Sequence, residues 1–140
     1  MPDHHKPFAI ALGFIIVFMI IYVVAGSIGW GLQAPNEQAI GEISRWCERV
    51  SPGAFREPSN ALSNMGFMLA GLLMLRVLSK DSEYLLGLNQ FFGFTPISIL
   101  YASSVIWLGA GSMLMHGTHT RWGASADNLS MVMYILIPWL

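Results

Sequence analysis

The chain has 140 residues, of which 54% are hydrophobic and only 11% are charged, with a formal net charge of −1. So few charges cannot cover the surface of a water-soluble domain of this size, and we expect a multi-pass integral membrane protein with a single transmembrane domain, residues 1–140. The near-neutral balance argues against nucleic acid as a partner, and a single cysteine, Cys47, excludes an internal disulfide.

The first apolar run, residues 8–32, carries no charge over its 25 positions. About 20 apolar residues cross a hydrocarbon core, so this run can span a bilayer with some tilt. A signal peptide is the alternative, because Lys6 precedes the run. The run is longer than the usual signal-peptide core, and Trp30 is suited to the membrane interface, so we favour a retained helix.

A charged segment, residues 33–58, follows the first run. Its stretch "NEQAIGEISRWCERV" predicts a short amphipathic helix at the membrane surface, with Ile40, Ile43 and Trp46 on the apolar side. The tripeptide "SPG" then ends this helix, and the remainder of the segment is expected to be a surface loop.

Three further apolar runs predict core helices at about residues 59–78, 96–116 and 127–140. Pro96 suits the first turn of the second of these helices. The last run is too short to cross a bilayer, so it is expected to be the truncated start of a helix that continues beyond residue 140. The basic residues divide almost evenly between the two sides of the membrane, so the orientation stays open, as does the oligomeric state.

Polar side chains cluster at the end of the 96–116 run, in the stretch "GSMLMHGTHTRWGASADN". Ser112 and His116 are four residues apart and therefore share a helix face. The chain must then reverse, which returns Asp127 to a similar depth. Ionisable groups at membrane depth are costly and indicate a functional site. His119 is a weaker candidate ligand, because "HGTH" is expected to lie in a loop.

Each of these residues also has a structural interpretation. Ser112 belongs to a small-residue stripe that lets helices approach closely. His116 could be a neutral imidazole bonded to a backbone carbonyl, and either Ser125 or Asp127 could cap the last helix. The joint occurrence of serine, histidine and aspartate in one stretch favours a site.

A second polar stretch, "REPSNALSNMGF", opens the 59–78 run. The structural interpretation of Glu57 is a helix cap, because a carboxylate is stabilised at the positive end of a helix dipole. Capping accounts less well for Asn60, Ser63 and Asn64, since unpaired amides inside an apolar helix are expensive. These residues, with Glu48 of the preceding loop, form a possible secondary site.

Taken in order, these motifs resemble the alkaline ceramidases, part of a membrane hydrolase superfamily that includes the adiponectin receptors. The resemblance covers roughly residues 45–131. It is carried by "WCE", which ends at Glu48, by Glu57 with "NALSN", by "GAGSMLMH", and by Asp127, which lies eleven residues after His116. The run 8–32 has no counterpart in this pattern and would be an added N-terminal helix.

The resemblance implies the N-terminal part of a seven-helix, all-α core with a buried zinc ion. It implies hydrolysis of the amide bond of ceramide or a related bilayer lipid by metal-activated water. His116 would bind the zinc, Ser112 would stand beside the reacting carbonyl, and Asp127 would steer a proton or hold a water molecule.

The sequence departs from the family pattern in three respects, one of which is a spacing from Glu48 to Glu57 that is shorter than in the family. The other two zinc ligands of the family come from a late HxxxH pair, which this sequence lacks, so they are expected beyond residue 140 and activity would require those helices. Arg45 replaces an aspartate of the family's calcium site, so calcium is not expected. An Arg45 salt bridge to Glu48 or Glu57 would then take over the tethering role of the ion.

Two other classes of function stay open. One is a non-catalytic, receptor-like or structural membrane protein of the same fold. The other is a haem-binding subunit, which is less favoured because only His116 is expected inside a helix, whereas haem ligation usually needs facing helices.

Overall fold

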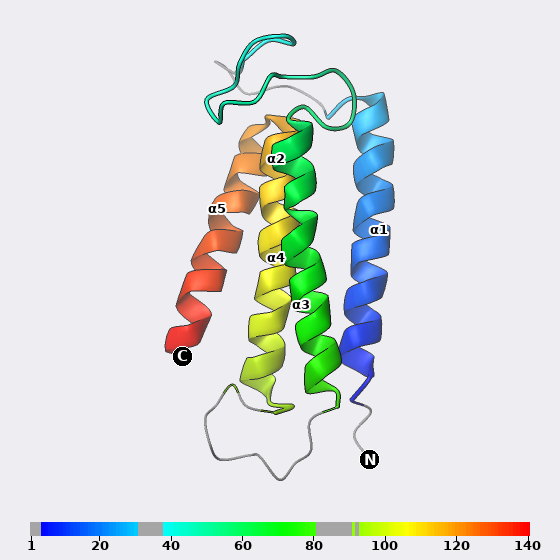
Figure 1. Cartoon of the computed structure of the whole chain (residues 1–140), viewed down its shortest axis with the longest axis vertical. Helices are drawn as coiled ribbons and strands as arrows, with labels where there is room; N and C mark the ends of the chain where they lie inside the picture. Colours follow the sequence, from blue (N-terminus) through cyan, green and yellow to red (C-terminus); the bar gives the residue numbers. More distant parts are fainter. Residues whose placement is uncertain (1–3, 31–37, 81–90, 92) are drawn as a thin grey trace.

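The computed structural model describes residues 4–30, 38–80, 91 and 93–140 (Figure 1). These ranges are helical with connecting loops, which confirms the all-α expectation for this part of the chain. The elements in chain order are α1 (Lys6–Ile28), α2 (Pro58–Ser63), α3 (Met65–Leu78), α4 (Pro96–Thr118), α5 (Arg121–Leu136) and a short 3-10 helix, η2 (Ile137–Trp139).

The long helices stand side by side and alternate in direction along the chain, with α3 and α4 in the middle, α1 beside α3 and α5 beside α4 (Figure 1). Residues 38–57, which precede α2, cross one end of the bundle. Three helical stretches are long and apolar enough to cross a membrane: Lys6–Ile28, Pro58–Leu78 and Pro96–Thr118. At 1.5 Å per residue, each reaches about 30 Å, the thickness of a hydrocarbon core. This arrangement agrees with an integral membrane protein.

Close packing between α3 and α4 depends on small residues. A Cβ added at Gly71 would lie 2.6 Å from the carbonyl oxygen of Ala102, and one added at Gly109 would lie 2.6 Å from that of Asn64. Because backbone lies on the other side of both contacts, neither glycine can be enlarged without separating the helices. Transmembrane helices typically pack in this way. Lipid provides no hydrophobic driving force between them, so they associate through the close van der Waals contacts that small residues allow.

Helix α1 is held to α4 by one buried tyrosine. The Tyr22 side chain is fully buried, its hydroxyl donates to the carbonyl oxygen of Met113 at 3.1 Å, and its ring stacks on Phe55. The added Cβ of a substituted Gly117 would coincide with the Tyr22 hydroxyl. Most other α1 side chains are exposed, Ile10 at 71% for example, as lipid contact would require. Helix α1 is therefore docked at the α4 end that carries His116.

The predicted amphipathic surface helix, residues 36–50, is wrong for residues 38–50. This segment folds back on itself instead, because the N–H of Gly41 donates to the carbonyl of Val50 and that of Ser44 donates to the carbonyl of Glu48. An isolated helix this short is marginal in water, and Gly41 has a φ of 93°, which is incompatible with a helix. The first two residues of the predicted helix, 36–37, lie outside the described part of the chain.

The last long helix begins at Arg121, six residues before the expected start at Asp127. Thr120 is its cap, since the Thr120 hydroxyl oxygen accepts a hydrogen bond from the N–H of Gly123 at 3.1 Å. The expectation that Ser125 or Asp127 caps this helix is therefore wrong. Both lie inside α5. The first turns of this helix are polar, so the hydropathy pattern does not show where it begins.

Candidate functional site

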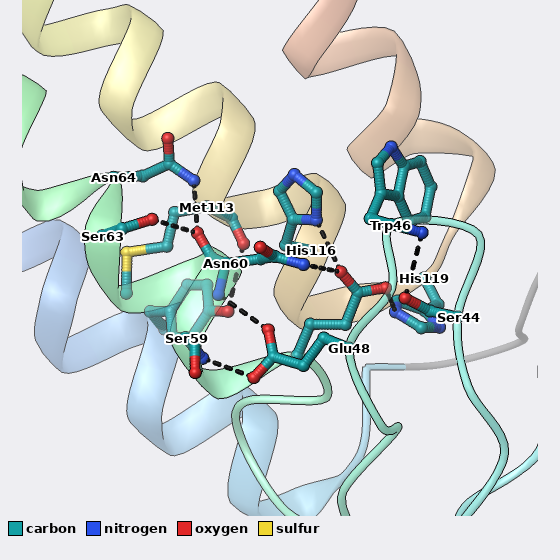
Figure 2. Close-up of polar contacts among 12 residues, drawn as sticks. Ser44, Trp46, Glu48, Ser59, Asn60, Ser63, Asn64, Met113, His116 and His119 are labelled. Atoms are coloured by element: carbon teal, nitrogen blue, oxygen red, sulfur yellow. Dashed lines mark hydrogen bonds and ion pairs between the residues drawn. The ribbon is translucent and has the colours of Figure 1, made fainter.

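The candidate site lies at the end of the bundle where α4 turns into α5, beside the loop that precedes α2. Figure 2 shows its polar side chains converging from three parts of the chain: the 44–48 turn, the start of α2, and the end of α4. The hydrogen-bonded partners Glu57 and His119 are separated by 62 positions in sequence. The site is therefore a product of tertiary packing.

Glu57 is at the centre of the cluster and is fully buried. Its Oε2 lies 2.8 Å from Nδ1 of His116 and 2.8 Å from Nδ2 of Asn60, and its Oε1 lies 2.8 Å from Nε2 of His119. The backbone N–H of Glu57 also donates to the carbonyl of His116 at 3.1 Å. A buried carboxylate is tolerated only with partners of this kind, and here both oxygens are engaged.

His116 lies in the last turn of α4, with 14% of its side chain exposed. Its Nδ1 faces Glu57, and the ring meets Trp46 edge to face with centroids 5.0 Å apart. Within the described residues, Nε2 makes no hydrogen bond. The structural alternative, a bond from the imidazole to a backbone carbonyl, is not what the structure shows, because the partner is a carboxylate.

His119 follows the end of α4 and has a left-handed backbone with a φ of 52°. This conformation is unfavourable for a residue with a Cβ. Its N–H donates to the carbonyl of Met115, and its buried ring bonds Glu57. His119 is the weaker candidate ligand in the sequence because the helix is predicted to end before it. That expectation was correct, but the sharp turn is what brings the ring back to Glu57.

Glu48 caps α2 through the backbone N–H groups of its first turn. Its two oxygens accept the backbone N–H groups of Ser59 at 2.7 Å and Asn60 at 2.8 Å. Partial desolvation raises the pKa of Glu48, but these N–H groups outweigh it, so its pKa is lower than the ordinary value. Among the ion pairs of the described residues, none joins Arg45 to Glu48 or Glu57, and the Arg45 guanidinium lies 5.3 Å from the Trp46 ring centroid.

The polar residues at the start of the second membrane stretch satisfy one another. The carbonyl of Asn60 accepts both the hydroxyl of Ser63 at 3.0 Å and the side-chain amide of Asn64 at 2.7 Å. The helix is interrupted at Asn64, which separates α2 from α3. These side chains therefore support a break in the helix, while the Asn60 amide group links the break to Glu57.

Ser112 and Asp127 come to a common level on adjoining helices. A Cβ added at Gly111 would lie 2.7 Å from the carbonyl oxygen of Ala126, so α5 passes α4 closely here. Both Ser112 and Asp127 are half-buried, and neither side chain makes a hydrogen bond within the described ranges. The structure thus brings the two residues to similar depth, with Ser112 one helical turn before His116, and no hydrogen bond joins Ser112 to Asp127.

The contact between His116 and Glu57 is of the kind found at zinc sites. An imidazole held at one nitrogen by a carboxylate is the usual arrangement of a metal-binding histidine. Across residues 4–30, 38–80, 91 and 93–140, no group of three or more His, Cys, Asp or Glu side chains is placed to hold a metal ion. His116 would therefore be one ligand among several, since a catalytic zinc takes three protein ligands and one open position.

Comparison with known proteins gives no match: no family model, curated protein or solved structure matches this chain. The function is therefore inferred from the chemistry of the site together with the motifs quoted above.

Proposed function

We propose that the chain is part of a zinc-dependent membrane amidase that hydrolyses the amide bond of ceramide or a related lipid. The supporting observation is that half-buried Ser112 and Asp127 lie level with each other, near His116, at one end of an apolar bundle. Neither hydroxyl nor carboxylate is used in a hydrogen bond among the described residues. Polar groups with no structural role are costly at membrane depth, which favours a chemical role.

Each residue has a role that its chemistry allows. A bound zinc ion would supply a water molecule made acidic enough to act as a nucleophile near neutral pH. His116 would hold that ion through Nε2, with the other two ligands expected beyond residue 140. Ser112 would donate a hydrogen bond to the substrate carbonyl oxygen as negative charge develops on it, and Asp127 would accept a proton during the reaction. A site at the end of the bundle suits a lipid whose chains stay in the bilayer.

Calcium is not part of the proposal. Oxygen ligands are what a hard cation requires. Glu48 is committed to the backbone of α2 and Glu57 to the two histidines, and Arg45 brings a positive charge into the same loop. These contacts support a calcium-free protein in which hydrogen bonds tie the loop to the helices.

A receptor-like or structural membrane protein is the second candidate. The observation that favours it is the engagement of both Glu57 oxygens by His116, His119 and Asn60, which would cross-link the loop, α2 and α4 with or without a metal ion.

Metal analysis and a lipid assay on the intact protein in detergent would test the proposal. We expect stoichiometric zinc that is lost in His116→Ala, and fatty-acid release from a panel of lipid amides that is abolished in Ser112→Ala. Ser103→Ala is the matched control, because its exposed hydroxyl lies on the same helix and bonds only the Ile99 carbonyl. Zinc that persists in His116→Ala rejects this ligand. Zinc without turnover on any lipid amide favours the receptor-like candidate.

A further inference from the structure

We propose that Glu57 is the positioning residue of His116, fixing its tautomer and ring direction so that Nε2 is presented to a metal ion. This inference rests on the proposed function, in which His116 binds zinc. It assigns a role to a buried glutamate that the reaction itself does not use.

The tautomer of His116 follows from which atoms of Glu57 and His116 can donate or accept a hydrogen bond. An ionised carboxylate has no proton to donate, so a ring nitrogen that bonds Glu57 must carry the hydrogen. Nδ1 of His116 lies 2.8 Å from Oε2, and a neutral imidazole has only one N–H. Nε2 of His116 therefore keeps its lone pair, which is the form that a metal ion requires. Metal-binding histidines almost always have such a partner on the second nitrogen.

The second step concerns what keeps Glu57 in place. The side chain is fully buried, and Oε1 is bonded to Nε2 of His119 at 2.8 Å. The backbone N–H of Glu57 bonds the carbonyl of His116, so the two residues are connected at both main chain and side chain. Rotating the carboxylate would break bonds to His116, His119 and Asn60 together, so the ring it orients has little freedom.

The two oxygens of Glu57 are not equivalent, and this predicts the effect of a neutral substitute. Oε2 accepts from both His116 and Asn60, whereas Oε1 faces His119. In Glu57→Gln, the amide oxygen should occupy the position with two donors, leaving the NH₂ group opposite His119. Nε2 of His119 must then accept, so His119 changes tautomer while His116 does not. Glu57→Leu removes the acceptor for both rings.

The test uses the intact protein in detergent, labelled with ¹⁵N-histidine and observed by NMR in alkaline buffer, with zinc affinity measured in parallel. Wild type should show His116 protonated at Nδ1 and His119 at Nε2. Glu57→Gln should change the tautomer of His119 alone. Glu57→Leu should release His116 from a single tautomer and weaken zinc binding by about 10–100-fold. Glu42→Gln is the matched control, an exposed glutamate of the same loop that bonds only the N–H of Ala39.

The outcomes separate this inference from the proposed function. If wild type binds zinc but His116 is protonated at Nε2, the positioning role is overturned and the amidase proposal stands. The same conclusion follows if a folded Glu57→Leu variant binds zinc as tightly as the control. Should Glu57→Leu fail to fold, the tautomers in Glu57→Gln decide, and an unchanged His119 overturns the role. Wild type that binds no zinc removes the proposed function, and the positioning role with it.

Discussion

Glu57 and His116 are joined twice, by a 2.8 Å contact between carboxylate and imidazole and by a 3.1 Å hydrogen bond between their backbones. The pair ties the start of α2 to the last turn of α4, which are separated by 59 positions in sequence. Hydrogen bonds thereby connect the loop before α2, α2 itself and the end of α4. We expect substitutions in and around this connected region to lower the stability of the fold.

Substitution of Gly117 by alanine should be strongly destabilising, because the new methyl group would occupy the position of the Tyr22 hydroxyl. Overpacking of this kind costs about 2–3 kcal/mol in free energy of unfolding. Unfolding experiments in detergent should measure this loss of stability when Gly117→Ala is made in wild type. The same substitution made in Tyr22→Ala should cost much less, because the space of the phenol is then empty. Equal costs in both backgrounds would contradict the contact.

Gly109 and Gly13 make a matched pair for the packing of α3 on α4. A Cβ at Gly109 would lie 2.6 Å from the carbonyl oxygen of Asn64, whereas one at Gly13 would meet nothing within 4 Å. We expect Gly109→Ala to lower the melting temperature in detergent. Gly13→Ala should leave it unchanged or raise it, since alanine favours a helix over glycine by about 1 kcal/mol. A similar loss in both variants would argue against close packing at Gly109.

The cap that Glu48 provides to α2 should weaken in acid. Because the pKa of Glu48 in the folded protein lies below its ordinary value of 4.5, the unfolded chain binds the proton more tightly. The stabilisation is therefore fully present above the ordinary pKa and is lost as the pH falls through the lowered one. The melting temperature of wild type should exceed that of Glu48→Gln near neutral pH, and the gap should close in acid. A gap that is independent of pH would be inconsistent with the cap.

Thr120 should matter for the start of α5. Loss of its hydroxyl in Thr120→Ala leaves the N–H of Gly123 without this acceptor and should cost about 1 kcal/mol. Thr120→Ser keeps the oxygen and should retain most of the stability in the same unfolding assay. If serine is as destabilising as alanine, the cap is not the reason that α5 begins at Arg121.

The sequence predicted the helices whose signal is local. Long uncharged runs at 8–32 and 96–116 are helical with ends within a few residues of expectation, because length and apolar content alone require it. The start of α5 was missed because its first turns are polar. A helix is predicted wrongly over residues 38–50 because three apolar residues at helical spacing also fit a chain that folds back.

The candidate site was predicted in part. Ser112, His116 and Asp127 were selected from their cost at membrane depth, and the structure puts them near one end of the bundle. The bond from Glu57 to His116 could not be predicted, since nothing in either stretch specifies a partner 59 positions away. The contact of His119 with Glu57 depends on a left-handed backbone conformation at His119. The local sequence does not predict this conformation at a residue other than glycine.

The Tyr22 ring has a bearing on how the N-terminal segment is handled by the cell. Proteolytic release of α1 would withdraw the phenol from its place beside Gly117 and break its hydrogen bond to the Met113 carbonyl, on the helix that carries His116. The described bundle thus depends on α1 staying attached, so a maturation step that trimmed it would be expected to loosen the very region where the histidines meet.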